Sequence, residues 1–260
     1  MRNTKRALLG AALVILTATS AFAESLKAAW RFERLVALAH ATADTDPTTG
    51  NNGDTGWRTI LTIQIKTPNA KELAIGVSLQ CGIVMDTTVR SKGGDLDSAA
   101  AQGRIKVQVK ITQPNGVVVY AQPDQGADLS GVLLGADTGV TYCDRYQKLE
   151  AKFAGLNCVA EQGDADGDGI SGEVTCATPE ELRLILKTLN ARHFNFLHAN
   201  AIPGVQKVEV QARAQAAVAL GGTQLGAAGS EAFAGAGALS VETIRLVQGA
   251  NGTTDLSDLR

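Results

Sequence analysis

The stretch Ile105-Lys106-Val107-Gln108-Val109-Lys110-Ile111 decides how this chain folds. Its aliphatic residues occupy one parity and its polar residues the other, which is typical of a β-strand with one buried and one wet face. The same alternation recurs in Val208-Glu209-Val210-Gln211-Ala212-Arg213-Ala214-Gln215 and in Leu61-Thr62-Ile63-Gln64-Ile65-Lys66. Strands of a parallel sheet, buried on both faces, would not alternate in this way, so the pattern favours antiparallel sheets.

Further strands are expected between Gly, Pro and Asn turn signals, at 72–84, 117–121, 140–153, 193–198 and 230–248. In the last of these the apolar parity slips between Val241 and Ile244, which predicts a β-bulge. Many strands separated by turns are typical of a β-sandwich or barrel. We therefore expect an all-β fold, an antiparallel β-sandwich over residues 57–248.

One short helix is predicted at about 179–190, crossing over the sandwich. Thr178 supplies an N-cap, Pro179 stands at the first helical position and Glu181 completes a capping box. A single apolar stripe follows at helical spacing: Leu182, Ile185, Leu186 and Leu189. This pattern indicates packing against a sheet rather than a binding site.

A turn glycine followed by a V-x-V-x-A strand comes after the predicted helix, in Pro203-Gly204-Val205 and Val208-Glu209-Val210-Gln211-Ala212. In this layout the chain resembles the immunoglobulin-like sandwiches of exported prokaryotic proteins of uncharacterised type. The resemblance covers most of residues 57–248, implies an immunoglobulin-like fold and implies no activity. The tyrosine corner of antibody-like domains is missing, because the strand at 205–216 holds no tyrosine.

The N-terminus has the three parts of a secretory signal peptide. A basic start, Met1 to Arg6, precedes an apolar core from Ala7 to Leu16 and the small-x-small site Ala21-Phe22-Ala23. The core is too short to span about 30 Å of hydrocarbon, and no later stretch is long and apolar enough. We expect cleavage near Ala23 and a secreted, periplasmic or cell-surface protein without a transmembrane segment in the mature chain.

Composition divides the chain into the signal peptide 1–23, an N-terminal segment and linker 24–56, a sandwich domain 57–248 with an insertion at 158–176, and a flexible tail 249–260. Residues 24–43 fit either a helix or an edge strand. The Ala- and Gly-rich region from Ala212 to Ala238 has two interpretations. Taken as a hairpin with small residues on both faces, it either allows close packing of two sheets with a flexible loop, or offers a flat edge or face that lets copies associate.

Four cysteines in an exported chain predict two disulfides. Cys81 shares the inward parity of its strand and Cys143 that of another, so these two are expected to bridge the sheets. Cys158 and Cys176 flank an acidic loop and would close it. Free buried thiols are the alternative, whereas a zinc site is not, because no C-x-x-C pair occurs.

The acidic loop is Asp164-Ala165-Asp166-Gly167-Asp168-Gly169, with carboxylates at alternate positions and a glycine at the turn. Calcium prefers six to eight hard oxygen ligands. Thr175 stands where an EF-hand has a bidentate glutamate, so the loop resembles the helix-free Asp/Gly calcium loops of extracellular modules. We predict a structural Ca²⁺ bound by Asp164, Asp166, Asp168, the carbonyl of Ile170, and Glu173. A solvated acidic turn is the alternative.

The remaining residues point away from catalysis and from nucleic acids. The net charge is −2 and no Lys/Arg run follows the signal peptide. His193 and His198 are five apart and would face opposite sides of a strand. No nucleophile elbow, zinc-protease motif or phosphate loop occurs. We assign no catalytic residue and do not expect an enzyme.

Our hypothesis is an exported, non-catalytic binding or structural protein that recognises a protein or glycan at the cell surface. The alternative is a self-assembling surface-layer or fibre subunit. A carbohydrate-active hydrolase is a third interpretation, because paired carboxylates need only spatial proximity.

Overall fold

The computed structural model describes residues 28–33, 40–44, 52–68, 71–91, 96–123, 133–134, 138–152, 158–160, 174–176, 180–222 and 226–245. These ranges contain strands and no helix. In chain order the strands are β1 (Ala28–Glu33), β2 (His40–Asp44), β3 (Gly53–Asp54), β4 (Arg58–Thr67), β5 (Lys71–Ser91), β6 (Leu96–Thr112), β7 (Val118–Tyr120), β8 (Val140–Lys152), β9 (Cys158–Ala160), β10 (Val174–Cys176), β11 (Glu180–Ala201), β12 (Gly204–Gly222) and β13 (Ala227–Ile244).

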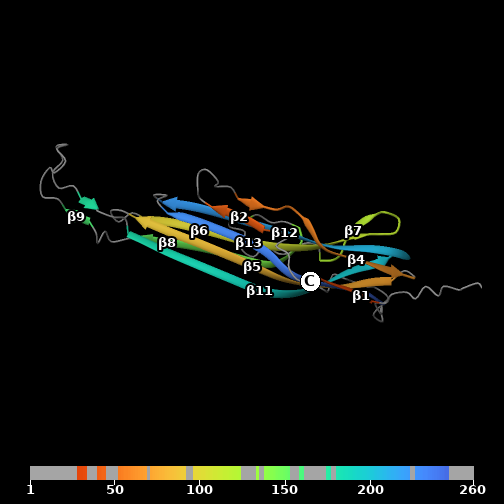
Figure 1. Cartoon of the computed structure of the whole chain (residues 1–260). Coiled ribbons are helices and arrows are strands. Elements are labelled where there is room, and N and C mark those ends of the chain that lie inside the picture. Colours follow the sequence, from red (N-terminus) through yellow and green to blue (C-terminus); the bar gives the residue numbers. More distant parts are fainter. Residues whose placement is uncertain are drawn as a thin grey trace, which may run out of the picture.

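The strands form two antiparallel sheets that lie face to face in an elongated sandwich (Figure 1). The β5 sheet has the order β1-β13-β5-β11, and β2 also pairs with β13. In the β6 sheet, β12 pairs with β3, β4 and β6, and β6 also pairs with β7 and β8. Strands β9 and β10 make a separate two-stranded ribbon beyond one end of the sandwich. The predicted all-β antiparallel sandwich is confirmed.

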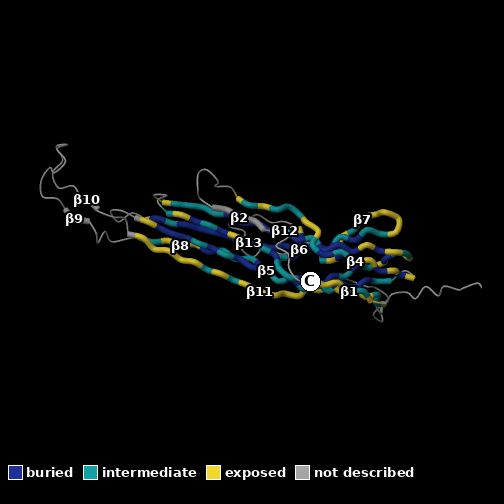
Figure 2. The backbone as a smooth tube through the Cα atoms, in the orientation of Figure 1, coloured by how far each residue is buried: buried dark blue, intermediate teal, exposed yellow. Residues whose placement is uncertain are grey.

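The core lies between the two sheets and follows the alternation read from the sequence. Every second residue of β5 is buried, from Leu73 to Met85. The facing row on β6 is the parity that contains Ile105, Val107, Val109 and Ile111, all with no exposed surface. Figure 2 shows the buried residues along the middle strands of both sheets. Burying each such aliphatic side chain stabilises the fold by about 1.5–3 kcal/mol.

The Ala- and Gly-rich region does not form a hairpin. Strand β12 belongs to the β6 sheet and β13 to the β5 sheet, so the chain crosses between sheets there. Their alanines pack inside, as Ala214 and Ala232 show with no exposed surface. A Cβ added to Gly103 of β6 would lie 2.7 Å from the Ile83 Cγ2 atom of β5. Small residues therefore let the sheets approach closely, which is the first of the two interpretations.

The predicted helix at 179–190 is wrong, because residues 180–201 form strand β11. It pairs with β5 from Glu180 to His198 without a register shift. Leucines at 182, 184 and 186 fit a period of two as well as a helical period, so the local pattern does not discriminate. Leaving this side of β5 unpaired would expose a long row of backbone hydrogen-bonding groups, and that long-range demand outweighs the local capping signals.

The predicted bulge in the last strand is misplaced. The register of β13 against β5 shifts between Ala234 and Gly237, whereas Val241 and Thr243 pair regularly. Two glycines and an alanine at 235–237 give the backbone the freedom that a bulge requires.

The N-terminal segment adds strands to both sheets. Residues 28–33 form the edge strand β1 on β13, not a helix. Strand β2 also pairs with β13, and β3 pairs with β12.

A disulfide joins Cys81 of β5 to Cys143 of β8, with 6.4 Å between the Cα atoms. It ties the two sheets together across the core, and both residues are buried. The pairing predicted from strand parity is confirmed.

Replacing both cysteines, as Cys81→Ala/Cys143→Ala, should lower the free energy of unfolding by about 4 kcal/mol, because the bond closes a loop of 62 residues in the unfolded chain. Guanidinium unfolding at neutral pH measures the loss. Reducing the wild-type chain should lower its stability at least as far. A loss below about 1 kcal/mol would mean that the bond does not restrain the unfolded chain.

Candidate functional site

Strand β8 of the β6 sheet and strand β11 of the β5 sheet form an edge of the sandwich that is open as far as the described residues go. Strand β11 pairs along its length with β5, and β8 pairs with β6. Within the facing sheet, β8 contacts β5 extensively and β11 only slightly. The β5 sheet therefore extends one strand beyond the sheet that faces it, and β11 overhangs.

The overhang leaves apolar side chains of β11 in solvent although they face inward. Leu182 and Leu184 are directly opposite Val89 and Thr87 of β5, so each pair shares one face of the sheet. The β5 residues are fully buried, whereas Leu182 is 45% and Leu184 39% exposed. On the outer face Ile185 and Leu189 are exposed as well.

A seam of polar contacts closes the gap between β8 and the β5 sheet. The amide of Gln147 donates to Thr87 Oγ1 and, at 3.3 Å, to the carbonyl of Leu184. Arg145 Nη1 donates to Thr188 Oγ1 at 2.7 Å. The phenol of Tyr142 donates to the carbonyl of Val77 at 2.9 Å. These bonds satisfy polar groups that would otherwise be stranded at the margin of the core.

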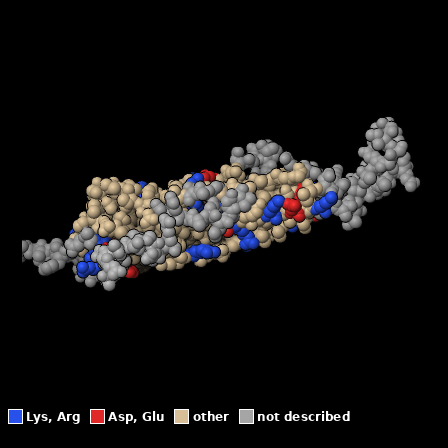
Figure 3. Space-filling view, turned by 180° about the vertical axis from the view of Figure 1, so that it is seen from behind, with Lys and Arg blue, Asp and Glu red and all other residues tan. Residues whose placement is uncertain are grey.

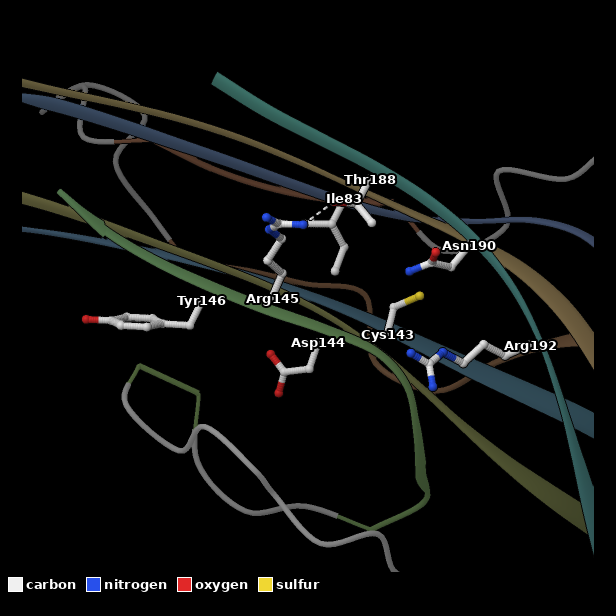
Figure 4. A pocket seen from close by; sticks show the side chains of 8 residues that line it. All are labelled: Ile83, Cys143, Asp144, Arg145, Tyr146, Thr188, Asn190 and Arg192. Carbon is white, nitrogen blue, oxygen red and sulfur yellow. Dashed lines mark hydrogen bonds between the residues drawn. The ribbon is translucent and has the colours of Figure 1, made fainter. Parts of the chain in front are cut away.

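Beside this seam the open edge holds a hollow of about 410 Å³ (Figure 4). Its lining comes from three strands: Ile83 of β5; Cys143, Asp144, Arg145 and Tyr146 of β8; and Thr188, Asn190 and Arg192 of β11. In Figure 4 the Arg145 and Thr188 side chains meet, and Asn190 and Arg192 project from β11 toward β8. Cys143, which is bonded to Cys81, brings the disulfide to the wall of the hollow.

The hollow carries positive charge. Asp144 turns away from the two arginines in Figure 4 and accepts hydrogen bonds from Arg104 Nε at 2.9 Å and Gln102 Nε2 at 3.0 Å. The Arg104 side chain has no exposed surface, so this ion pair is almost enclosed. Arg145 and Arg192 remain as the cations that face the hollow. Two guanidinium groups beside an amide suit a carboxylate or another oxyanion.

Elsewhere the charges are dispersed. Figure 3 shows Lys, Arg, Asp and Glu of the described surface in small mixed groups along one face. Several are paired across strands, as Arg183 is with Asp86 and Arg213 with Asp54. Each arginine lowers the pKa of its carboxylate partner through a hydrogen bond. This pattern stabilises the sheet surface and does not form a basic face for a polyanion.

The second feature of the open edge is the backbone of β11 itself. The N–H and C=O of Leu197 bond to Gln122, on the side away from β5. Successive residues of a strand point their backbone groups to opposite sides, and the register on β5 is unbroken up to His198. Odd-numbered residues from 181 to 195 therefore direct their N–H and C=O groups away from β5. Within the described ranges no strand pairs with them.

The predicted metal ligands Asp164, Asp166, Asp168, Ile170 and Glu173 lie outside the described residues. Among those the structure does describe, no three His, Cys, Asp or Glu side chains gather as a metal site would need. His193 and His198 do lie on opposite faces of β11, as predicted. The Nδ1 atom of His193 is 2.8 Å from Ser78 Oγ on the outer face, whereas His198 is buried and burial lowers its pKa.

The ribbon that brackets the acidic loop has an informative register. Strands β9 and β10 are antiparallel, and Cys158 is directly opposite Cys176. Residues directly opposite in an antiparallel pair have Cα atoms about 4.5–5.5 Å apart, within the range of a disulfide. The backbone thus brings the two cysteines to the spacing that the predicted bond requires.

Sequence reasoning missed the residues of the hollow. The signal was present in β11, where polar residues at 188, 190 and 192 interrupt the inward apolar parity of Leu182, Leu184 and Leu186. Such an interruption marks a stretch of strand that no sheet covers. It became readable only once 180–201 was known to be a strand.

Comparison with known proteins adds little. No family model matches the chain, and no curated protein matches it. Two solved structures of infectious bursal disease virus are similar in part. The Gx strain is 8% identical, with a TM-score of 0.17 over 89% of this chain and 44% of that chain. The Gt strain is 11% identical, with a TM-score of 0.16 over 90% and 47%. This chain thus spans less than half of the viral chains, and likenesses this weak carry no argument.

In the described part of the chain, no helix has the length and apolar character needed to cross a bilayer.

We predict that Tyr142, a residue of this seam, contributes to the free energy of unfolding in a pH-dependent way. Burial raises the pKa of its phenol above the ordinary value of about 10. The stabilisation from the neutral phenol is therefore fully present below about pH 10. Above that pH the free energy of unfolding falls by about 1.4 kcal/mol per pH unit, as the pH rises toward the pKa of Tyr142 in the folded state. Tyr142→Phe should cost about 1 kcal/mol at neutral pH through the lost bond to Val77.

Urea unfolding at about pH 7 and pH 11 checks this, with the exposed Tyr120→Phe as the matched control. The deficit of Tyr142→Phe should shrink or reverse at the alkaline pH. An equal deficit at both values would show that the phenol is not held neutral by the core.

Proposed function

We propose that this chain is an exported, non-catalytic binding or structural protein that acts at the cell surface, in the periplasm or outside the cell. The observation that carries the proposal is the buried Cys81–Cys143 disulfide between the two sheets. Disulfides persist in oxidising compartments, which agrees with the predicted signal peptide and its expected cleavage near Ala23. The immunoglobulin-like type is part of the same proposal, supported by two antiparallel sheets with a bond between them.

The second part of this proposal is a structural calcium site in the acidic loop between β9 and β10. The Asp164-x-Asp166-x-Asp168 pattern is the main support, and the opposed Cys158 and Cys176 agree with a loop closed at its base. Without a cation, carboxylates this close in sequence repel one another. A bound Ca²⁺ would offset the repulsion and stabilise the insertion by mass action.

Calorimetric titration of the mature chain with CaCl₂ tests the site. We expect binding at one site with a dissociation constant of about 10⁻⁴–10⁻³ M, as in extracellular modules. At about 10 mM calcium this corresponds to about 1.4–2.7 kcal/mol of added stability in the unit that holds the site. Asp166→Asn should weaken binding at least about tenfold, because it removes one charged ligand.

The matched control is Glu242→Gln, an exposed carboxylate on β13 far along the chain from the loop. It should bind calcium like the wild type. No heat of binding in the wild type, or equal binding by Asp166→Asn, would overturn the calcium site.

A second candidate function, self-assembly into a layer or fibre, is favoured by the open edge. Strand β11 is 22 residues long, and over most of that length no strand in the described part of the chain pairs with its outer backbone groups. Exposed apolar residues line it, and an unguarded edge of this kind pairs readily with another strand. The 24–43 segment offers a further surface, since Trp30 is 80% and Phe32 53% exposed on β1. The alanines between the sheets are buried and take no part.

Sedimentation velocity over a range of concentrations tests this function. A self-assembling subunit should show a larger species whose share of the protein rises with concentration. If the edge of the sandwich is responsible, this species should form both in the presence of calcium and in the presence of a chelator. A monomer under every condition contradicts assembly.

A further inference from the structure

We propose that β11 pairs with β11 of a second copy, antiparallel, so that two β5 sheets become one continuous sheet around a two-fold axis at Leu184. This inference rests on the self-assembly function and names the surface and the register that carry it. The occupant of the open edge is thus another copy of this chain.

The backbone sets the first condition. Odd-numbered residues of β11 offer their N–H and C=O groups to the open side, and antiparallel strands bond where such residues stand opposite one another. A two-fold axis through any residue of β11 meets this condition, because it sets odd positions opposite odd positions. A symmetric contact also closes into a dimer, with each copy giving and receiving the same bonds.

Charge selects among the possible axes. An axis at Arg183 or at Lys187 would set that residue opposite itself, and an axis at Ile185 would set Arg183 opposite Lys187. Like charges directly opposite destabilise a strand pair. An axis at Leu184 instead sets Glu181 opposite the partner's Lys187, twice by symmetry, which is favourable.

Apolar matching agrees with the same axis. With Leu184 on the axis, Leu182 stands opposite the partner's Leu186, and Leu184 stands opposite itself. These are the inward leucines that the β6 sheet leaves uncovered, with Leu182 at 45% and Leu184 at 39% exposure. An axis at Leu186 would instead set Leu182 opposite Asn190 and Leu184 opposite Thr188, mixing apolar with polar residues.

The chosen register is also compatible with the other contacts that β11 makes. It uses residues 180–188, so that of the β11 residues lining the hollow only Thr188, at the end of the paired span, is included, whereas Asn190 and Arg192 lie outside it. It also leaves the Gln122–Leu197 bridge intact. The surface is therefore confined to the stretch where unpaired backbone, uncovered leucines and opposite charges coincide.

Cysteine cross-linking tests the register on the full mature chain. Leu184 stands opposite itself in a pair without mutual backbone bonds, where Cα atoms are about 4.5 Å apart, a spacing that a disulfide accepts. Leu184→Cys should give a covalent dimer under mild oxidation. The control is Leu189→Cys, on the same strand and more exposed at 59%, which has no symmetric partner and should stay monomeric on a non-reducing gel.

Edge prolines test the backbone pairing. The N–H of Ile185 faces the open side, so Ile185→Pro removes no bond to β5, and proline is tolerated at such edge positions. We expect at least about a tenfold rise in the dimer dissociation constant, with the melting temperature of the monomer retained. Leu189→Pro is the matched control, because its N–H faces the same side outside the paired span, and it should associate like the wild type.

A charge reversal adds a further test of register. Lys187→Glu should weaken association, because it sets a glutamate opposite the partner's Glu181, whereas Lys187→Arg keeps the charge and should associate like the wild type. A wild-type chain that stays monomeric overturns both the assembly function and this inference. An oligomer that survives Ile185→Pro, or that Leu184→Cys fails to cross-link, overturns this inference alone and assigns assembly to another surface.

Discussion

The alternation of inward and outward side chains along β5 fixes the register of its sheet and the position of the disulfide. One parity of this strand, from Leu73 to Met85, fills the space between the sheets and includes Cys81. Because the side-chain period is two, a slip of one residue would turn that whole row outward and carry the cysteine away from β8. Strand β5 also pairs with β13 on one side and β11 on the other, so its register fixes the positions of both neighbours.

The unequal width of the two sheets follows from this arrangement and produces the candidate site. Strand β11 completes β5, but the β6 sheet ends at β8 and does not cover it. The chain responds in two ways along the same edge. Near the disulfide it places polar residues that bond across the gap, as Arg145 does with Thr188. Farther along it leaves leucines in solvent, and that cost is offset only if something covers them.

Much of the fold could be predicted from the sequence, because period-two alternation is a local signal of which face is buried. That signal located the strands and, through the parity of Cys81 and Cys143, the disulfide. It failed at 180–190, where the leucines fit two periods and the capping residues favoured a helix. That question is decided only by the side of β5 that β11 pairs with, from Ser91 to Cys81, which is far from 180–190 in the sequence. The hollow was equally beyond reach, because its residues become neighbours only when β8 and β11 are known to be edges.

The two edge strands at the open side differ in how well their side chains prevent pairing with another chain, and this difference indicates a function for the edge. Strand β8 ends in Lys148, Glu150 and Lys152, all exposed, and charged residues of this kind discourage pairing with other chains. Strand β11 carries charges on its outer face as well, but its inward face holds exposed leucines, and no strand among the described residues pairs with its outer backbone groups. If the edge only had to stay soluble, lysines at these inward positions would serve better, since no sheet covers them. The leucines are therefore better explained if a second copy of the chain covers this surface when the protein assembles.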